Sequence, residues 1–291
     1  DVLSSILSKS HIHISTVKGY HLPATVDKNT LVIAVSVSGE TDETISVLNE
    51  SIKTKCKKIV FSKDKTKLES LCNKNGVLHF APDLYHSPRA SFVSFLYYML
   101  DSLGSTLKIK KEDIQDSIKS LQIIRKEIRT SNLDPKNNKA LELASWISGT
   151  PVIYYPWGLM AAAIRFKNSL NENAKMHAIA EDVIEASHNG IVAWQRPSNF
   201  QPILIEGRDD FFKTKERWNI LKDFFNSKNI EYKEVKSIEG SILAKLVTLI
   251  YLLDYTSIYK AFLMGLDPSP VGPIDFVKNR LKTVEPTKEM M

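Results

Sequence analysis

Short apolar segments alternate with longer segments of helical periodicity along the chain. This alternation is typical of βα units, in which helices cover a parallel sheet. The expected strands are residues 11–17, 31–36, 58–61, 77–80, 152–155, 202–206 and 231–235. The expected helices are residues 41–54, 65–74, 89–103, 113–129, 140–148, 159–170, 212–227, 242–264 and 274–281. The pattern therefore predicts an α/β fold.

Residues 131–138 consist of turn formers and helix breakers and divide this pattern into two stretches. We therefore expect two domains, residues 1–130 and 131–291, each a parallel sheet flanked by helices. The residues after Asp1 read as the body of a helix without its beginning. The N-terminal part of the first domain is therefore expected to be missing from this sequence. A preceding strand would make the apolar strand 31–36 a central one.

Charge and composition narrow the class of protein. The net charge of +6 comes mostly from scattered lysines, whereas nucleic-acid binders concentrate basic residues on one element. No nucleic-acid partner is therefore expected. Cys56 and Cys72 are the two cysteines and lie in no CxxC pair, so neither a metal site nor a redox motif is expected.

The most apolar stretch, residues 242–264, is interrupted by Lys245, Asp254 and Lys260. A membrane-spanning helix needs about 20 nearly uncharged residues. We therefore expect a buried helix and no membrane partner. The two unpaired cysteines favour a reducing compartment, so a cytoplasmic protein is expected.

The strongest local motif runs from the strand 31–36 into Ser-Val-Ser-Gly-Glu-Thr at residues 36–41. A buried strand here meets a turn of small residues that begins a helix. Unpaired backbone N–H groups at a helix N-terminus bind phosphate, and Ser36, Ser38 and Thr41 add three hydroxyl groups. The alternative is N-capping by Ser38 or Thr41 alone, which requires one hydroxyl rather than three. The motif lacks the lysine of a P-loop and the glycines of a dinucleotide fingerprint, so no nucleotide cofactor is expected.

This Ser-x-Ser-Gly-x-Thr-x-Glu-Thr run resembles the SIS (sugar isomerase) family, which consists of flavodoxin-like domains and binds phosphosugars at this turn. Further segments resemble the bifunctional phosphoglucose/phosphomannose isomerases of that family, in the same order along nearly the whole chain. They are residues 20–24, 88–90, 171–175, 187–189, 206–210, 267–270 and 274–278. The Gly-Ser turn that the family uses upstream of its first helix does not occur ahead of Val2 in this sequence.

The resemblance implies roles for seven residues. The phosphate ligands would be Ser36, Ser38 and Thr41, with Arg89 near the reacting carbons. The catalytic residues would be Glu172 as the base, His188 as the ring-opening acid and Lys278 as its helper. The resemblance also implies a homodimer in which His188 is contributed across the interface, and it implies no metal and no cofactor.

The chemistry of isomerisation requires these residue types. A carboxylate can move a proton between neighbouring carbons through a cis-enediol, and a histidine can protonate the ring oxygen of a cyclic sugar. The resemblance thus implies interconversion of glucose 6-phosphate or mannose 6-phosphate with fructose 6-phosphate. One alternative is a non-catalytic phosphosugar-binding regulator, which would need the phosphate site but no base. Another is the isomerase part of an amino-sugar synthase, which would need an attached glutaminase domain.

Overall fold

The computed structural model describes residues 1–283 and divides the chain into two compact units. One unit is Leu7–Ile114, and the other combines Asp1–Ile6 with the chain from Gln115 onward. Each unit holds one parallel sheet flanked by helices, which confirms the predicted fold class. The domain boundary after residue 130 stays a prediction. It falls just behind helix α5 (Lys111–Ile128), whereas the chain passes from one compact unit to the other between Ile114 and Gln115, within that helix.

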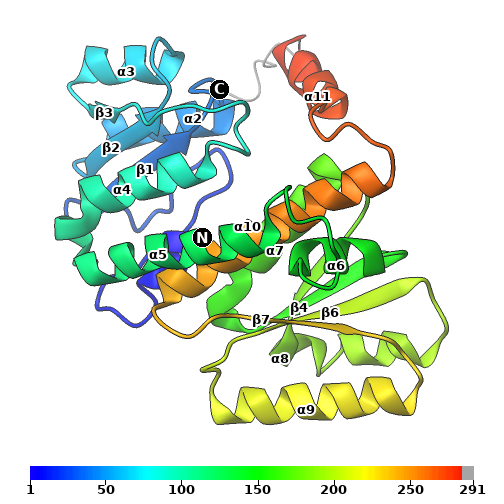
Figure 1. The fold of residues 1–291 in the computed structure, drawn as a ribbon. Coiled ribbons are helices and arrows are strands. Elements are labelled where there is room, and N and C mark those ends of the chain that lie inside the picture. Colours follow the sequence, from blue (N-terminus) through cyan, green and yellow to red (C-terminus); the bar gives the residue numbers. More distant parts are fainter. Residues whose placement is uncertain (284–291) are drawn as a thin grey trace. The chain divides into compact units, whose positions relative to one another are not determined.

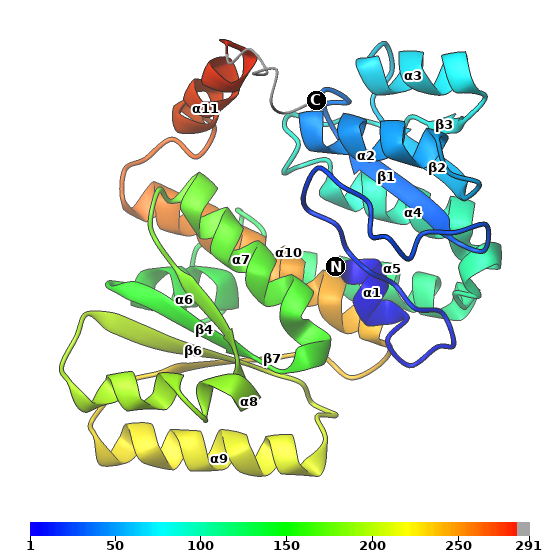
Figure 2. The same ribbon diagram turned by 180° about the vertical axis from the view of Figure 1, so that it is seen from behind.

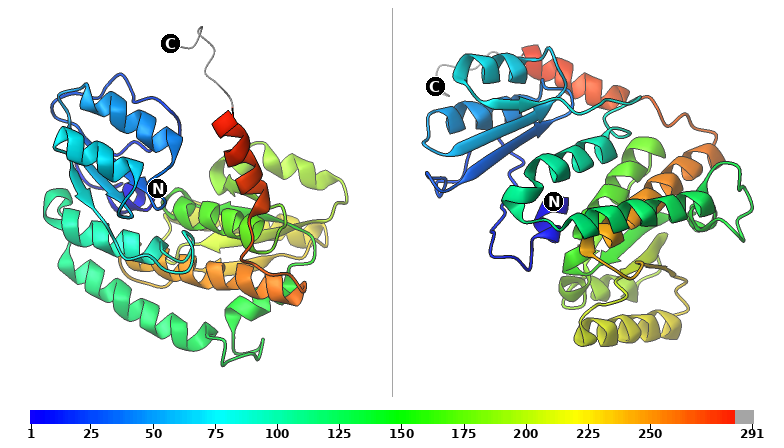
Figure 3. Two further views of the ribbon diagram at one scale, coloured as in Figure 1. Left: turned by 90° about the horizontal axis from the view of Figure 1, so that it is seen from above. Right: turned by 60° about the vertical axis from the view of Figure 1, so that its left-hand side comes forward.

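The sheet of the first unit has the order β1-β2-β3. Its parallel strands are β1 (Leu31–Ser36), β2 (Lys57–Ser62) and β3 (Leu78–Phe80). The helices α2 (Asp42–Ile52) and α3 (Lys67–Asn75) pack on one face through a cluster of Ala34, Leu48, Val60, Leu68 and Cys72. The opposite face carries α4 (Phe92–Leu107) (Figure 3), and there Tyr98 packs against the rings of Phe61 and Phe80. The first sheet is therefore covered on both faces, as βα units require.

The expected strand at residues 11–17 is wrong, because the structure forms a loop there. The alternation of apolar and polar residues in this loop is still reflected in their exposure, since Ile12 and Ile14 are half-buried while His11 and His13 are exposed. A strand also needs a neighbour for its backbone groups. Within residues 1–283, β1 pairs only with β2, so residues 11–17 form no backbone hydrogen-bond ladder with it.

The sheet of the second unit has the order β5-β4-β6-β7 and is also parallel. Its strands are β4 (Thr150–Tyr155), β5 (Ile179–Asp182), β6 (Phe200–Glu206) and β7 (Lys233–Lys236). The edge strand β5 was not predicted from the sequence. Its residues Ile-Ala-Glu-Asp are all at least partly exposed, so it lacks the apolar run that identifies a buried strand.

Helices cover both faces of this second sheet (Figures 1 and 2). On one face lie α8 (Val183–Ala186), the 3-10 helix η2 (Gly190–Gln195) and α9 (Phe212–Ser227). Their core cluster with the sheet is Val152, Tyr154, Val183, Ala186, Trp194, Leu204, Trp218, Leu221 and Phe225. On the other face lie α6 (Lys139–Trp146), the 3-10 helix η1 (Trp157–Leu159), α7 (Met160–Asn173) and α10 (Ile242–Leu263).

Helix α10 is long and apolar enough to cross a membrane by length and composition. In the structure 67% of its most apolar window is buried, and it packs against α6 and α7. This is the environment of a core helix. The short helix α1 (Val2–Ile6) packs against α7 and α10, and α11 (Gly272–Thr283) follows the loop behind α10.

Candidate functional site

The three hydroxyl groups predicted to bind phosphate converge at the turn between β1 and α2. The Ser36 Oγ lies 2.7 Å from the Thr41 Oγ1 and 3.4 Å from the Ser38 Oγ. The Ser38 Oγ and Thr41 Oγ1 are 3.5 Å apart. Ser36 is 5% exposed, so it forms the floor of this cluster, and Ser38 and Thr41 are more accessible.

The N-capping alternative does not account for this arrangement. Thr41 is the N-cap residue of α2, but its side chain makes no capping hydrogen bond to the helix. The Thr41 hydroxyl faces Ser36 instead, and the Ser38 Oγ accepts a hydrogen bond from the Glu40 N–H. The first backbone N–H groups of α2 therefore donate no hydrogen bond to the side chain of the N-cap residue. Such groups and the positive end of the helix dipole favour an anion.

The turn is held by the beginning of α3, which the sequence analysis did not foresee. The Gly39 carbonyl accepts a hydrogen bond from the Leu68 N–H at 3.2 Å, and the Glu40 carboxylate accepts one from the Lys67 N–H at 2.9 Å. Gly39 has φ of 67°, and a Cβ there would lie against three atoms of Thr66, the farthest at 2.6 Å. A glycine is therefore required both by the backbone conformation and by the close approach of Thr66.

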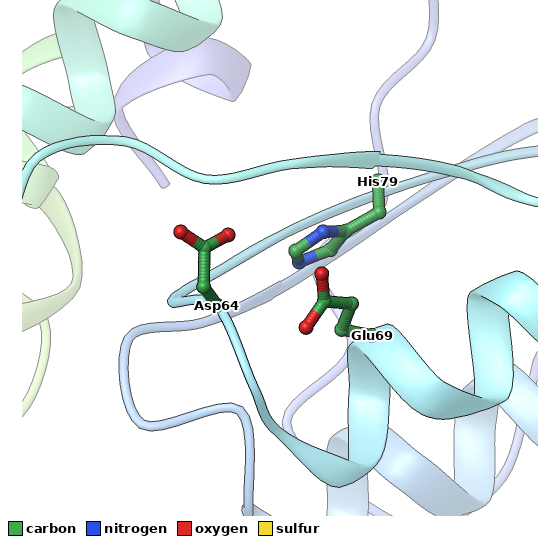
Figure 4. A group of neighbouring side chains, drawn as sticks. All are labelled: Asp64, Glu69 and His79. Atoms are coloured by element: carbon green, nitrogen blue, oxygen red, sulfur yellow. The ribbon is translucent and has the colours of Figure 1, made fainter.

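Three side chains that could ligate a cation lie together beside α3: Asp64, Glu69 and His79, with ligand atoms within 4.8 Å of one another (Figure 4). Two of the three are already bonded. The His79 Nε2 lies 2.8 Å from the Ser62 Oγ, and the Glu69 carboxylate accepts a hydrogen bond from the Lys65 N–H at 2.5 Å. These bonds brace the turn between β2 and α3, which is the structural role that the geometry supports.

Arg89 is half-buried and lies in the turn ahead of α4. The helix was expected to begin at Arg89, but it begins at Phe92, behind the N-cap residue Ser91. The Ser91 hydroxyl donates to the Ser87 carbonyl and accepts from the Tyr85 N–H, which orders this turn. Arg89 belongs to the same compact unit as the hydroxyl cluster.

Glu172 is half-buried in the last turn of α7, in the other compact unit. Polar contacts on one side of α7 fix this helix to α10. Arg165 forms an ion pair with Asp254 at 2.7 Å, and the Ser169 hydroxyl donates to the same carboxylate at 2.7 Å. Asn173 continues the series one turn later and donates to the Ser257 Oγ at 2.8 Å. The spacing of four residues places these three side chains on one helix face.

His188 is exposed and follows α8, and Lys278 is exposed on α11. Because β4 and β5 are parallel, α7 returns from the end of β4 to the beginning of β5. Glu172 therefore precedes β5 at its N-terminal end, whereas His188 follows β5 at its C-terminal end. The structure thus brings Ser36, Ser38 and Thr41 together, and it leaves Glu172 and His188 at opposite ends of one strand.

Comparison with known proteins identifies the family. Residues 136–281 match the family described as the bacterial phospho-glucose isomerase C-terminal SIS domain. A bifunctional phosphoglucose/phosphomannose isomerase of Caldicellulosiruptor bescii is 32% identical over 96% of this chain and 84% of its own length. An enzyme of the same name from Aquifex aeolicus is 30% identical over 91% of this chain and 80% of its own length. The chain belongs to the bifunctional phosphoglucose/phosphomannose isomerase family.

The fold of this family member also matches solved structures. The crystal structure of a hypothetical protein from Thermus thermophilus aligns with a TM-score of 0.75, with 14% identity, over 97% of this chain and 79% of that protein. Family membership confirms the resemblance seen in the residues around the Ser36–Thr41 turn and in the second half of the chain. The roles of individual site residues stay predictions.

Proposed function

We propose that this protein is an aldose–ketose isomerase that interconverts glucose 6-phosphate, mannose 6-phosphate or both with fructose 6-phosphate. Family membership supports the reaction class, since the relatives from Caldicellulosiruptor and Aquifex are named for these two isomerase activities. The observation that carries the proposal for this chain is the cluster of three hydroxyl groups at the N-terminus of α2. Hydroxyl and backbone donors at a helix N-terminus suit the phosphate that these substrates share.

In the proposed mechanism Ser36, Ser38 and Thr41 bind the phosphate. His188, helped by Lys278, protonates the ring oxygen while the anomeric hydroxyl loses its proton, and the sugar ring opens. The Glu172 carboxylate then takes the proton from C2 of the open aldose and returns it to C1 of the cis-enediol. Arg89 stabilises the negative charge that develops on the enediolate oxygen.

The site of this enzyme is proposed to form in a homodimer, with His188 supplied by the second copy. The arrangement around β5 supports this, because Glu172 and His188 lie at opposite ends of the strand within one chain. A site that needs both side chains is then completed by an isologous partner. We further propose a cytoplasmic location and a division into domains at residues 1–130 and 131–291.

A mixing experiment tests the shared site. Glu172→Gln and His188→Ala are purified separately, combined, and unfolded and refolded together. If each site takes its residues from two chains, half of the dimers are mixed and one of their two sites is intact. About a quarter of the wild-type activity should then return. If each site is built within one chain, mixing restores nothing.

The isomerase is distinguished from the non-catalytic phosphosugar-binding regulator by Glu172. Conversion of fructose 6-phosphate to each aldose is measured with and without EDTA, for the wild type and for Glu172→Gln. The variant should bind the phosphosugar normally and lose about 10²- to 10⁴-fold in kcat, as expected for a lost general base. Glu216→Gln, which removes an exposed carboxylate of α9, serves as the control. A wild-type protein that binds the sugar without converting it would support the regulator.

A further inference from the structure

Lys175 lies directly behind α7 and uses its ammonium group in an unusual way. The Nζ donates to the Glu172 carbonyl at 2.6 Å, to the Pro270 carbonyl at 2.6 Å and to the Pro268 carbonyl at 3.4 Å. An ammonium group has three donors, so all three are directed at backbone oxygens. The side chain thereby joins the end of α7 to the loop that leads into α11.

The backbone of Lys175 adopts the left-handed conformation, with φ of 56°. This is common just behind a helix, where glycine is usually preferred. The conformation alone indicates no function, because Lys65 and Lys108 adopt it as well, with φ of 57° and 54°. Lys108 also ends a helix, α4, through a backbone bond from its N–H to the Gly104 carbonyl. Lys175 differs because its side chain also contacts residues more than 90 positions away in the sequence.

A helix cap explains only part of this contact. The last carbonyls of a helix lack partners, and a cation near the C-terminus stabilises both them and the helix dipole. The bond to the Glu172 carbonyl satisfies that requirement. The bonds to Pro268 and Pro270 do not, because these carbonyls belong to the loop between α10 and α11. That loop carries two prolines, Pro268 and Pro270, which have no N–H to anchor it.

We propose that Lys175 is a positioning residue that sets the distance between Glu172 and α11, the helix that carries Lys278. The inference rests on the proposed function, in which Glu172 and Lys278 act on one substrate. Lys175 holds the main chain of Glu172 itself and, through the same nitrogen atom, the beginning of the segment that ends in α11. Asn171 supports the same turn, since its side chain donates to the Met176 carbonyl at 2.8 Å. Loss of the three hydrogen bonds of Lys175 should leave the phosphate-binding turn unchanged and misplace Glu172 relative to Lys278.

The test compares Lys175→Met with Lys108→Met, which removes the same charge at a matched left-handed helix end. Lys175→Met should lower kcat by about 10- to 100-fold, because misplacements of about 1 Å have effects of this size, and change KM little. Amide hydrogens of α11 should also exchange faster in this variant. Lys175→Arg should recover part of kcat, since a guanidinium also reaches several carbonyls. Lys108→Met should leave kcat and the exchange of α11 unchanged.

Two results would overturn the inference. One is a kcat of Lys175→Met within about twofold of the wild type, which would reduce Lys175 to a helix cap. The other is a loss of kcat with unaltered amide hydrogen exchange in α11, which would mean that the hydrogen bonds of Lys175 do not hold that helix. An inactive wild-type protein would instead refute the proposed function. Faster amide hydrogen exchange in Lys175→Met would then still establish that Lys175 holds the segment leading into α11.

Discussion

The Ser36 Oγ lies 2.7 Å from the Thr41 Oγ1, and the Thr41 side chain therefore does not cap the helix that Thr41 begins. A threonine at an N-cap position ordinarily accepts a hydrogen bond from the first turn. Here its hydroxyl joins those of Ser36 and Ser38, and the first N–H groups of α2 are left without that acceptor. The capping hydrogen bond that would stabilise the first turn of α2 is absent, and the three hydroxyl groups form a cluster of donors instead.

Replacing Ser38 tests whether this cluster binds phosphate. Ser38→Ala should weaken binding of fructose 6-phosphate by about 2 kcal/mol, or roughly 30-fold, since hydrogen bonds to charged groups contribute about 1.5–3 kcal/mol. Binding of unphosphorylated fructose should not change. Isothermal titration calorimetry with both sugars measures the difference, with Ser46→Ala in the middle of α2 as the control. An equal loss for the two sugars would make Ser38 a structural residue only.

Gly39 and Gly76 form a matched pair for testing how tightly the turn is packed. Both have positive φ, 67° and 63°, but a Cβ at Gly76 meets nothing within 4 Å, whereas a Cβ at Gly39 collides with Thr66. Gly76→Ala should cost only the left-handed conformation, about 1–2 kcal/mol of unfolding free energy. Gly39→Ala should cost more, because the overlap with Thr66 adds to this. Urea denaturation of the two variants compares them, and equal losses would contradict the close approach of α3.

The ion pair of Arg165 and Asp254 should contribute to stability more than the surface pairs do. Its side chains are 21% and 23% exposed, and Asp254 also accepts from Ser169. Asp254→Ala leaves both donors without this acceptor and should lower the unfolding free energy by about 2–4 kcal/mol. Glu216→Ala breaks the exposed pair with Lys213 and should cost at most about 1 kcal/mol. Similar losses in denaturant titrations would contradict this, because the ion pair of Arg165 and Asp254 would then contribute no more than a surface pair.

Glu206 should make stability depend on pH. Burial at the end of β6 raises the pKa of its carboxyl group, and the Lys222 ammonium, 2.7 Å away, opposes this. A carboxyl group whose pKa is higher in the folded protein binds more protons there than in the unfolded chain. Its contribution to stability is therefore full below about pH 4.5 and is lost as pH rises through the folded-state pKa.

The variant Glu206→Gln removes this titration. Relative to the wild type, it should gain stability steadily as the pH rises above about 4.5, because the wild type alone loses the contribution of the protonated carboxyl. Urea denaturation of both proteins between about pH 4 and pH 7 gives the difference curve. A difference that falls with rising pH would mean that the ion pair with Lys222, rather than burial, controls Glu206. Glu216→Gln again controls for the loss of one carboxylate.

The sequence by itself determined the parts of this protein that depend on neighbouring residues. The run from Leu31 to Thr41 is an apolar strand, a glycine turn and a helix start in direct succession, so its hydroxyl groups are brought together by local geometry. The helical periodicity of α9 and α10 likewise predicted both helices within a residue of their ends. Local geometry and hydrophobic period are encoded over a few residues and need no distant partner.

Only the tertiary structure decided the features that depend on distant partners. The alternating segment at residues 11–17 has the period of a strand, but no strand of the described chain pairs with it. The polar segment of β5 lacks that signal and becomes a strand because β4 lies beside it. Lys175 reads as an ordinary surface lysine until the loop at Pro268 and Pro270 returns to it. A hydrogen bond between remote segments leaves no periodic trace in the sequence, because its partners are brought together only by the packing of the whole fold.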